Sequence, residues 1–72
     1  MEILVKARFN SSRERFETYG RNKYLIYLPF PEDEDSLPIL IEILSRQMGV
    51  SQKNIIFKRK SVVANDWVFE IN

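Results

Sequence analysis

The segment SLPILIEILSRQMG, residues 36–49, decides the fold of this chain. Its apolar side chains recur every three or four positions, which is the spacing of an α-helix with one apolar side. The stripe is formed by Leu37, Leu40, Ile41, Leu44 and Met48, and it is widened by Ile43. Pro38 fits only the first turn of a helix, and Gly49 is typical of the left-handed residue that follows the last turn. The spacing therefore predicts an amphipathic helix over residues 36–48 that packs on a sheet.

Four acidic residues, EDED at positions 32–35, stand directly before this helix. The free backbone N–H groups and the positive dipole end of a helix favour negative charge at its start. The alternative is a divalent metal site on Asp33 and Asp35, which would make the protein a carboxylate-dependent enzyme. Mg²⁺ and Ca²⁺ need oxygen ligands from further segments, and no third ligand group is identifiable in the sequence. We therefore interpret residues 32–35 as the helix start and expect no metal and no other cofactor.

Two strands and a hairpin are predicted before the helix. Residues 2–9 alternate apolar and polar side chains, as a strand with one buried face does. Residues 23–28 are rich in tyrosine, leucine and isoleucine and form the next strand, paired with the extended chain that precedes Gly20. Gly20 and Asn22 can both take the positive φ angle that a hairpin turn needs. Pro29 and Pro31 lack backbone donors and end that strand.

Two further strands are predicted after the helix, over residues 54–58 and 67–71. The loop of residues 59–66 joins them into a second hairpin, with its turn near residues 64–66. The fold class that follows is α+β in a single domain over residues 1–72. We expect a two-layer sandwich of about four strands in a mixed or antiparallel sheet, with one amphipathic helix packed on one face.

The composition supports a folded core, because 44% of the residues are hydrophobic and five phenylalanines, three tyrosines and one tryptophan are present. The predicted core follows from the apolar positions of each element. It contains Ile3, Val5, Ala7, Phe9, Ile26, Leu40, Ile41, Leu44, Met48, Ile56, Trp67, Phe69 and Ile71.

The residue types that are missing exclude most familiar chemistry. The chain has no histidine and no cysteine, so disulfides, thiolate nucleophiles, the usual zinc sites and imidazole catalysis are absent. Its two glycines, Gly20 and Gly49, make no phosphate-binding glycine loop. We therefore expect a protein that is not an enzyme. The absence of a basic leader and of a run of about 20 apolar residues leads us to expect a cytoplasmic location and no membrane contact.

The formal charge of +1 hides an uneven distribution along the chain. The net charge is +3 over residues 1–28, −4 over residues 29–50 and +2 over residues 51–72. If the fold brings both ends together, one surface becomes basic and attracts anionic partners. The candidate contact residues are the run Lys58, Arg59 and Lys60, with Lys53 nearby, joined by Arg8, Arg13 and Arg15.

These basic residues predict a non-enzymatic interaction module that binds RNA or DNA phosphates through a basic loop. Short basic runs are more often solvated loop charges, and an acidic protein is a further partner that they allow.

An alternative function uses the sheet face that the helix leaves uncovered. Leu4, Leu25 and Val68 on that face would suit a protein partner or a second copy of the chain. The chain also has three tyrosines, Tyr19, Tyr24 and Tyr27. Such rings stack on bases when they stand on an open face, although strand propensity favours packing roles for most of them.

The order of the elements and four stretches of sequence carry a family resemblance. The stretches are LVKARFNSSRERF, LIYLPFPEDED, LIEILSRQMGVSQKNI and WVFEI. In these the chain resembles the uncharacterised YggU-like family of small α/β domains. That family has a Gly-Lys-Ala-Asn signature at the helix start and a Gly-x-x-Ser-Arg-x-Lys signature between the last strands, where residues 34–37 and 60–66 here differ. The resemblance implies the two-layer fold, and it implies no activity, cofactor or site.

Overall fold

The computed structural model describes residues 1–62 and 65–72. The elements in these residues are β1 (Glu2–Arg8), β2 (Arg15–Gly20), β3 (Lys23–Tyr27), α1 (Ser36–Met48), the short 3₁₀-helix η1 (Gln52–Asn54), β4 (Ile55–Lys60) and β5 (Trp67–Ile71). Neither helix of this described part is long and apolar enough to cross a lipid bilayer.

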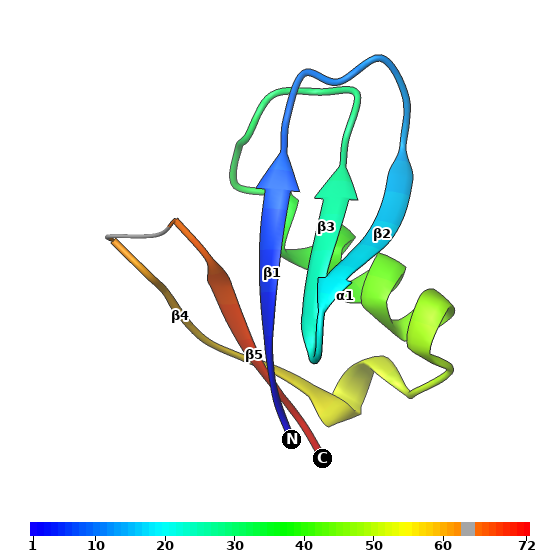
Figure 1. The fold of residues 1–72 in the computed structure, drawn as a ribbon, viewed down its shortest axis with the longest axis vertical. Coiled ribbons are helices and arrows are strands. Elements are labelled where there is room, and N and C mark those ends of the chain that lie inside the picture. The colour runs from blue at the N-terminus through cyan, green and yellow to red at the C-terminus, as the bar shows by residue number, and fades with distance from the viewer. Residues whose placement is uncertain (63–64) are drawn as a thin grey trace.

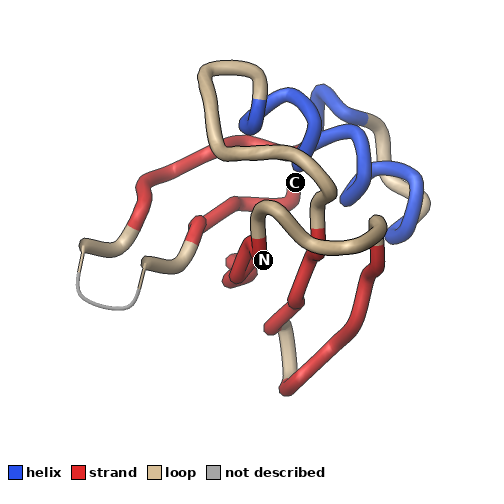
Figure 2. The backbone as a smooth tube through the Cα atoms, turned by 90° about the horizontal axis from the view of Figure 1, so that it is seen from above, coloured by secondary structure: helices blue, strands red, loops and turns tan. Residues whose placement is uncertain are grey.

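The strands form one mixed sheet in the order β2-β3-β1-β5-β4. β1 and β3 are parallel, whereas β2 with β3, β1 with β5 and β4 with β5 are antiparallel. The helix α1 covers one face of the sheet (Figures 1 and 2), and the two chain ends lie side by side because β1 pairs with β5. This arrangement confirms the predicted α+β fold class, with two hairpins and one helix on the sheet.

The helix α1 spans the predicted residues, with Leu40, Ile43 and Leu44 buried against the sheet. Gly49 ends it with a φ of 70°, and the Gly49 N–H donates a hydrogen bond of 2.9 Å to the Ser45 carbonyl. Such a left-handed residue satisfies a carbonyl of the last turn that has no partner within the helix. The apolar spacing and the glycine therefore act together to set the length of α1.

The acidic segment lies in the turn before α1, with no acidic residue in the first helical turn. The Asp33 carboxylate accepts a hydrogen bond of 2.8 Å from the Asp35 N–H, and the buried Ser36 hydroxyl accepts one of 2.9 Å from the Asp33 N–H. These bonds fold the chain into the helix start. Within residues 1–62 and 65–72, no three acidic side chains group closely enough to hold a metal ion.

The core between the sheet and α1 matches the prediction at Ile3, Val5, Ile26, Leu40, Leu44, Trp67, Phe69 and Ile71. The predicted core residues Ala7, Phe9, Ile41 and Met48 are half-buried and pack against it. The prediction that Ile56 belongs to the core was wrong. Its neighbour Ile55 faces the core opposite Ile71, whereas Ile56 is 43% exposed. A shift of one residue in a strand moves every side chain to the other face. Leu28, Ile43 and Val68 are further buried residues that the prediction missed.

The predicted loop of residues 59–66 begins later than expected. Arg59 and Lys60 belong to β4, which continues through an irregularity between Phe57 and Arg59 to pair with the start of β5. The Ser61 N–H donates a hydrogen bond of 2.7 Å to the Asp66 carbonyl beyond the end of this pairing. The turn predicted near residues 64–66 falls partly outside the described residues.

Gly49→Ala is expected to lower the free energy of unfolding by about 1 to 2 kcal/mol, because alanine is strained in the left-handed conformation. No atom lies within 4 Å of a Cβ at this position, so the cost comes from the backbone alone. Urea denaturation followed by Trp67 fluorescence measures it. Gly20→Ala is the matched control, since its φ is ordinary and its Cβ meets only the flexible Lys23 side chain at 3.1 Å. Equal losses in the two variants would contradict the assignment of Gly49 as the helix end.

Candidate nucleic-acid interface

The candidate site lies on the sheet face opposite α1. Ile3 and Val5 of β1 are buried beneath the helix, so the alternation of a strand turns Arg8 to the uncovered face. Arg8 stands opposite Tyr27 of β3, and Tyr27 stands opposite Arg15 of β2. These three residues form one line across three adjacent strands, which we call the arginine row.

Tyr27 is the aromatic centre of the arginine row. The Arg15 guanidinium carbon lies 5.2 Å from the centre of the Tyr27 ring, which is a cation–π distance. Arg15 is also paired with Glu17, and its side chain is 50% exposed. Adjacent strands are about 4.8 Å apart, so the backbones that carry Arg8 and Arg15 are separated by about 10 Å. Arg8 and Arg15 thus stand on the two sides of Tyr27 in the strand register, and the Arg15 guanidinium lies over its ring.

The chain around the arginine row is held by local hydrogen bonds. The Arg8 carbonyl accepts a bond of 2.9 Å from the Leu28 N–H and one of 2.8 Å from the Ser11 hydroxyl. Arg13 is exposed in the loop that joins β1 to β2. This loop leaves the end of the sheet at which the arginine row lies (Figure 1), so Arg8, Arg13 and Arg15 share that end.

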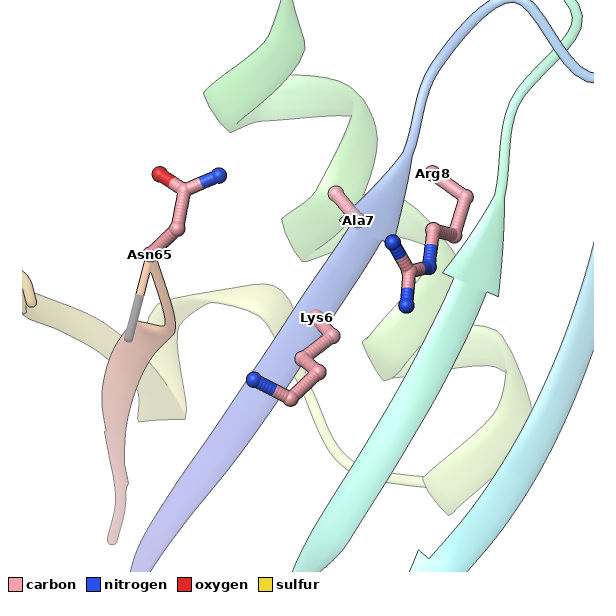
Figure 3. A pocket seen from close by; sticks show the side chains of 4 residues that line it. All are labelled: Lys6, Ala7, Arg8 and Asn65. Atoms are coloured by element: carbon pink, nitrogen blue, oxygen red, sulfur yellow. The ribbon is translucent and has the colours of Figure 1, made fainter. Parts of the chain in front are cut away.

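A small pocket of about 90 Å³ adjoins the arginine row on the β5 side. It is lined by Lys6, Ala7, Arg8 and Asn65 (Figure 3). The ammonium of Lys6 extends toward the β5 side of β1, whereas the Arg8 guanidinium lies toward β3. The Lys6 ammonium donates a hydrogen bond of 2.8 Å to the carboxylate of Asp66, a residue that is only 8% exposed. Two cations, one anion and an amide side chain therefore meet at the end of β1.

Asp66 changes the titration of Lys6. The pKa of the Lys6 ammonium is raised, chiefly by its hydrogen bond to Asp66, and desolvation acts in the opposite direction. A group whose pKa is higher in the folded chain stabilises the fold at every pH below its unfolded pKa, and this contribution is lost as the pH rises through the folded pKa. The Lys6 contribution is therefore present at neutral pH and is lost in alkali.

Asp66→Asn is expected to flatten the loss of stability above a pH of about 10.5, the ordinary lysine pKa. The asparagine keeps the shape of the side chain and removes the charge that raises the pKa of Lys6. Urea midpoints of the variant and the parent protein, measured from neutral pH to that alkaline range, give the comparison. Parallel stability profiles for the two proteins would show that the pair contributes nothing to the pH dependence.

The predicted contacts on β4 lie away from the arginine row. β4 and β2 are the opposite edges of the sheet, with three strands between them. Lys58 and Arg59 are exposed, and an Arg59 guanidinium nitrogen is 3.9 Å from a carboxylate oxygen of Glu2. Lys53 is exposed in η1, at the other end of the sheet from the arginine row (Figure 1). The structure does not bring these residues together with Arg8 and Arg15.

Lys60 is separated even from its sequence neighbours. Its ammonium lies 2.6 Å from a carboxylate oxygen of Glu32 and 4.7 Å from the centre of the Trp67 ring. Trp67 belongs to the core under α1, so Lys60 is turned to the helix side of the sheet. The basic run therefore divides between two faces, because adjacent strand residues point in opposite directions.

Sequence reasoning did not assign a site role to Lys6 or Asn65, and it left Tyr27 undecided between stacking and packing. Tyr24 packs instead on the helix side, with its ring 5.4 Å from that of Phe16. The alternation in β1 already placed Lys6 beside Arg8 on one face. Nothing in the sequence placed Tyr27 between two arginines, because that position depends on the order of the strands.

Comparison of the chain with protein-family models, with curated proteins and with solved structures gives no match.

Proposed function

We propose that this protein is a non-enzymatic binding module that holds a nucleic acid, RNA or DNA, on the uncovered face of its sheet. The observation that carries this proposal is the arginine row, in which Tyr27 stands between Arg8 and Arg15. Arginine pairs with phosphate in a planar, two-pronged geometry, and aromatic rings accept bases by stacking. A sheet face that presents arginine and an aromatic ring in one line suits a nucleic acid strand, in which phosphates and bases alternate.

A single strand fits this surface better than a duplex. Bases in a duplex are stacked on each other, and their faces are out of reach of a tyrosine ring. The Arg15 guanidinium lies over the Tyr27 ring, so the two groups form a platform on which a base can stack through the plane of the guanidinium. The basic residues of β4 are not part of this platform, so the proposal rests on the first hairpin rather than on Lys58, Arg59 and Lys60.

The alternative, a protein or homodimer contact on the same face, has less support. Val68 is only 2% exposed, and Leu4 and Leu25 are half-buried among charged neighbours. The exposed large hydrophobic residues of the described chain are Met1, Tyr19, Ile56 and Val62. Tyr19 of β2 and Ile56 of β4 lie on opposite edges of the sheet, and Val62 follows the end of β4, whereas a docking surface needs a contiguous apolar patch. A cytoplasmic location and the resemblance to the YggU-like family remain parts of the proposal.

The proposal is tested by fluorescence anisotropy with labelled RNA and DNA strands of about ten nucleotides, a length within the range that one small domain covers. Binding at low salt is expected, with log K falling against log salt by about 0.7 for each phosphate that the protein neutralises. A duplex of the same sequence is expected to bind more weakly, because it offers no unstacked base. No change of anisotropy at low salt, for either strand, would refute the proposed function.

A further inference from the structure

The pocket beside the arginine row is formed where two strands separate. The pairing of β1 with β5 ends at Val5 opposite Trp67, whereas the pairing of β1 with β3 continues to Arg8. Ala7 therefore lies beyond the last residue of β1 that is paired on the β5 side. The separation leaves a gap at the end of β1 that Asn65 adjoins (Figure 3).

The backbone of Ala7 points into this gap. The Leu4 N–H donates to the Asn22 carbonyl and the Arg8 carbonyl accepts from the Leu28 N–H, so even-numbered residues of β1 direct their backbone groups toward β3. The Met1 carbonyl accepts from the Ile71 N–H on the opposite side. Backbone groups alternate in direction along a strand, so the N–H and carbonyl of Ala7 point toward the pocket.

The residues that line the pocket carry hydrogen-bond donors beside the acceptor carbonyl of Ala7. The Ala7 N–H and the Lys6 ammonium lie on the pocket side of β1, Asn65 adds a side-chain amide, and Arg8 lines the pocket with its guanidinium turned toward β3. Phosphate oxygens accept hydrogen bonds from such groups, and both arginine and lysine are common phosphate ligands. A volume of about 90 Å³ leaves room for one small group such as a phosphate.

We propose that this pocket is a subsite for one phosphate group. The inference rests on the proposed function, in which the group belongs to the nucleic acid strand held by the arginine row. Arg8 lines the pocket and also stands in the row, so it joins the two parts of the interface. A strand that crosses Tyr27 places its neighbouring phosphate beside Lys6 and Asn65.

Asp66 opposes an anion in the pocket. Its carboxylate is held 2.8 Å from the Lys6 ammonium, and its negative charge repels a phosphate nearby. Asp66→Asn removes this charge at constant size. The affinity of the pocket for phosphate is therefore expected to rise by about threefold to tenfold in this variant, which corresponds to roughly one unit charge acting across a partly solvated site.

The test is a titration of the labelled full chain with inorganic phosphate, followed by ¹H–¹⁵N NMR at constant ionic strength with chloride as the reference. Saturable shifts of the Ala7 and Arg8 backbone amides and of the Asn65 side-chain amide are expected. Shifts that do not saturate, or shifts of equal size with chloride, would overturn the subsite.

Asn65→Gly provides a second test of the phosphate subsite if Asp66→Asn fails to fold. Asn65 has a φ of 56°, which glycine adopts without strain, so the variant removes the amide and leaves the backbone in place. Asn22→Gly is the matched control, because Asn22 has a φ of 58° and lies in the turn between β2 and β3. Weaker phosphate binding in Asn65→Gly alone supports the subsite, and equal binding in both variants overturns it.

The oligonucleotide titration separates this inference from the proposed function. If the oligonucleotide binds but inorganic phosphate causes no saturable shifts at the pocket, the phosphate subsite is overturned and the proposed function is retained. Saturable phosphate binding without binding of either strand supports the pocket as an oxyanion site and overturns the proposed function.

Discussion

Phe69→Ala is expected to lower the free energy of unfolding by about 3 to 5 kcal/mol, the range measured when a large aromatic side chain is removed from a core. Phe69 is fully buried in β5, opposite Ile3, and its ring centre lies 5.5 Å from that of Phe57. A domain of this length has a total stability of roughly 4 to 11 kcal/mol. The variant should therefore lose a large part of its stability, which far-UV circular dichroism would detect as a lower urea midpoint.

Two neighbouring isoleucines of β4 provide the control for this prediction. Ile55→Ala removes a buried side chain and is expected to cost about 2 to 4 kcal/mol, whereas Ile56→Ala changes an exposed one and should cost less than about 1 kcal/mol. The two substitutions are chemically identical, so the difference reports only which side of β4 faces the core. A larger loss for Ile56→Ala would contradict the register of β4.

The double substitution Arg8→Ala and Arg15→Ala is expected to have the largest effect on nucleic acid binding. It removes both guanidinium groups of the arginine row and should weaken binding at low salt by about tenfold to a hundredfold. The slope of log K against log salt should fall by about 1.4, because two phosphate contacts to a single strand are lost. Fluorescence anisotropy with the strands described above measures both quantities.

The matched control for the arginine pair removes two charges from the other edge of the sheet. Lys58→Ala with Arg59→Ala gives the same change of net charge, and both residues are exposed. We expect less than about a threefold loss of affinity in this variant. Equal losses in the two double variants would mean that the overall charge, and not the arginine row, attracts the strand.

The position and length of the helix were predictable because several independent signals coincide in one short segment. The apolar spacing sets its face, Pro38 limits its start and Gly49 sets its end. The β4 strand was less predictable because Ile55 and Ile56 are adjacent, and either could face the core without any change in composition. Arg59 and Lys60 were assigned to the loop of residues 59–66, yet pairing with β5 holds them in the sheet.

The candidate site depends on strand order, which local patterns do not specify. Arg8 and Arg15 were candidates from the sequence, but they become neighbours of Tyr27 only because β3 inserts between β1 and β2. The sequence signals predict the β2–β3 hairpin and are silent on which strand lies beside β1. The basic run Lys58, Arg59 and Lys60 was predicted as a contact site from its composition. The alternation of side chains along β4 divides this run between the two faces of the sheet.

The central claim, that a nucleic acid strand lies on the arginine row, is tested most directly by ¹H–¹⁵N NMR mapping of the full chain during titration with the single strand. The account predicts that the largest shifts occur at the backbone amides of Arg8, Arg15 and Tyr27, with little change in the outer side of α1 or at Lys58. Shifts that concentrate at Lys53, Lys58 and Arg59, with the arginine row unaffected, would contradict it.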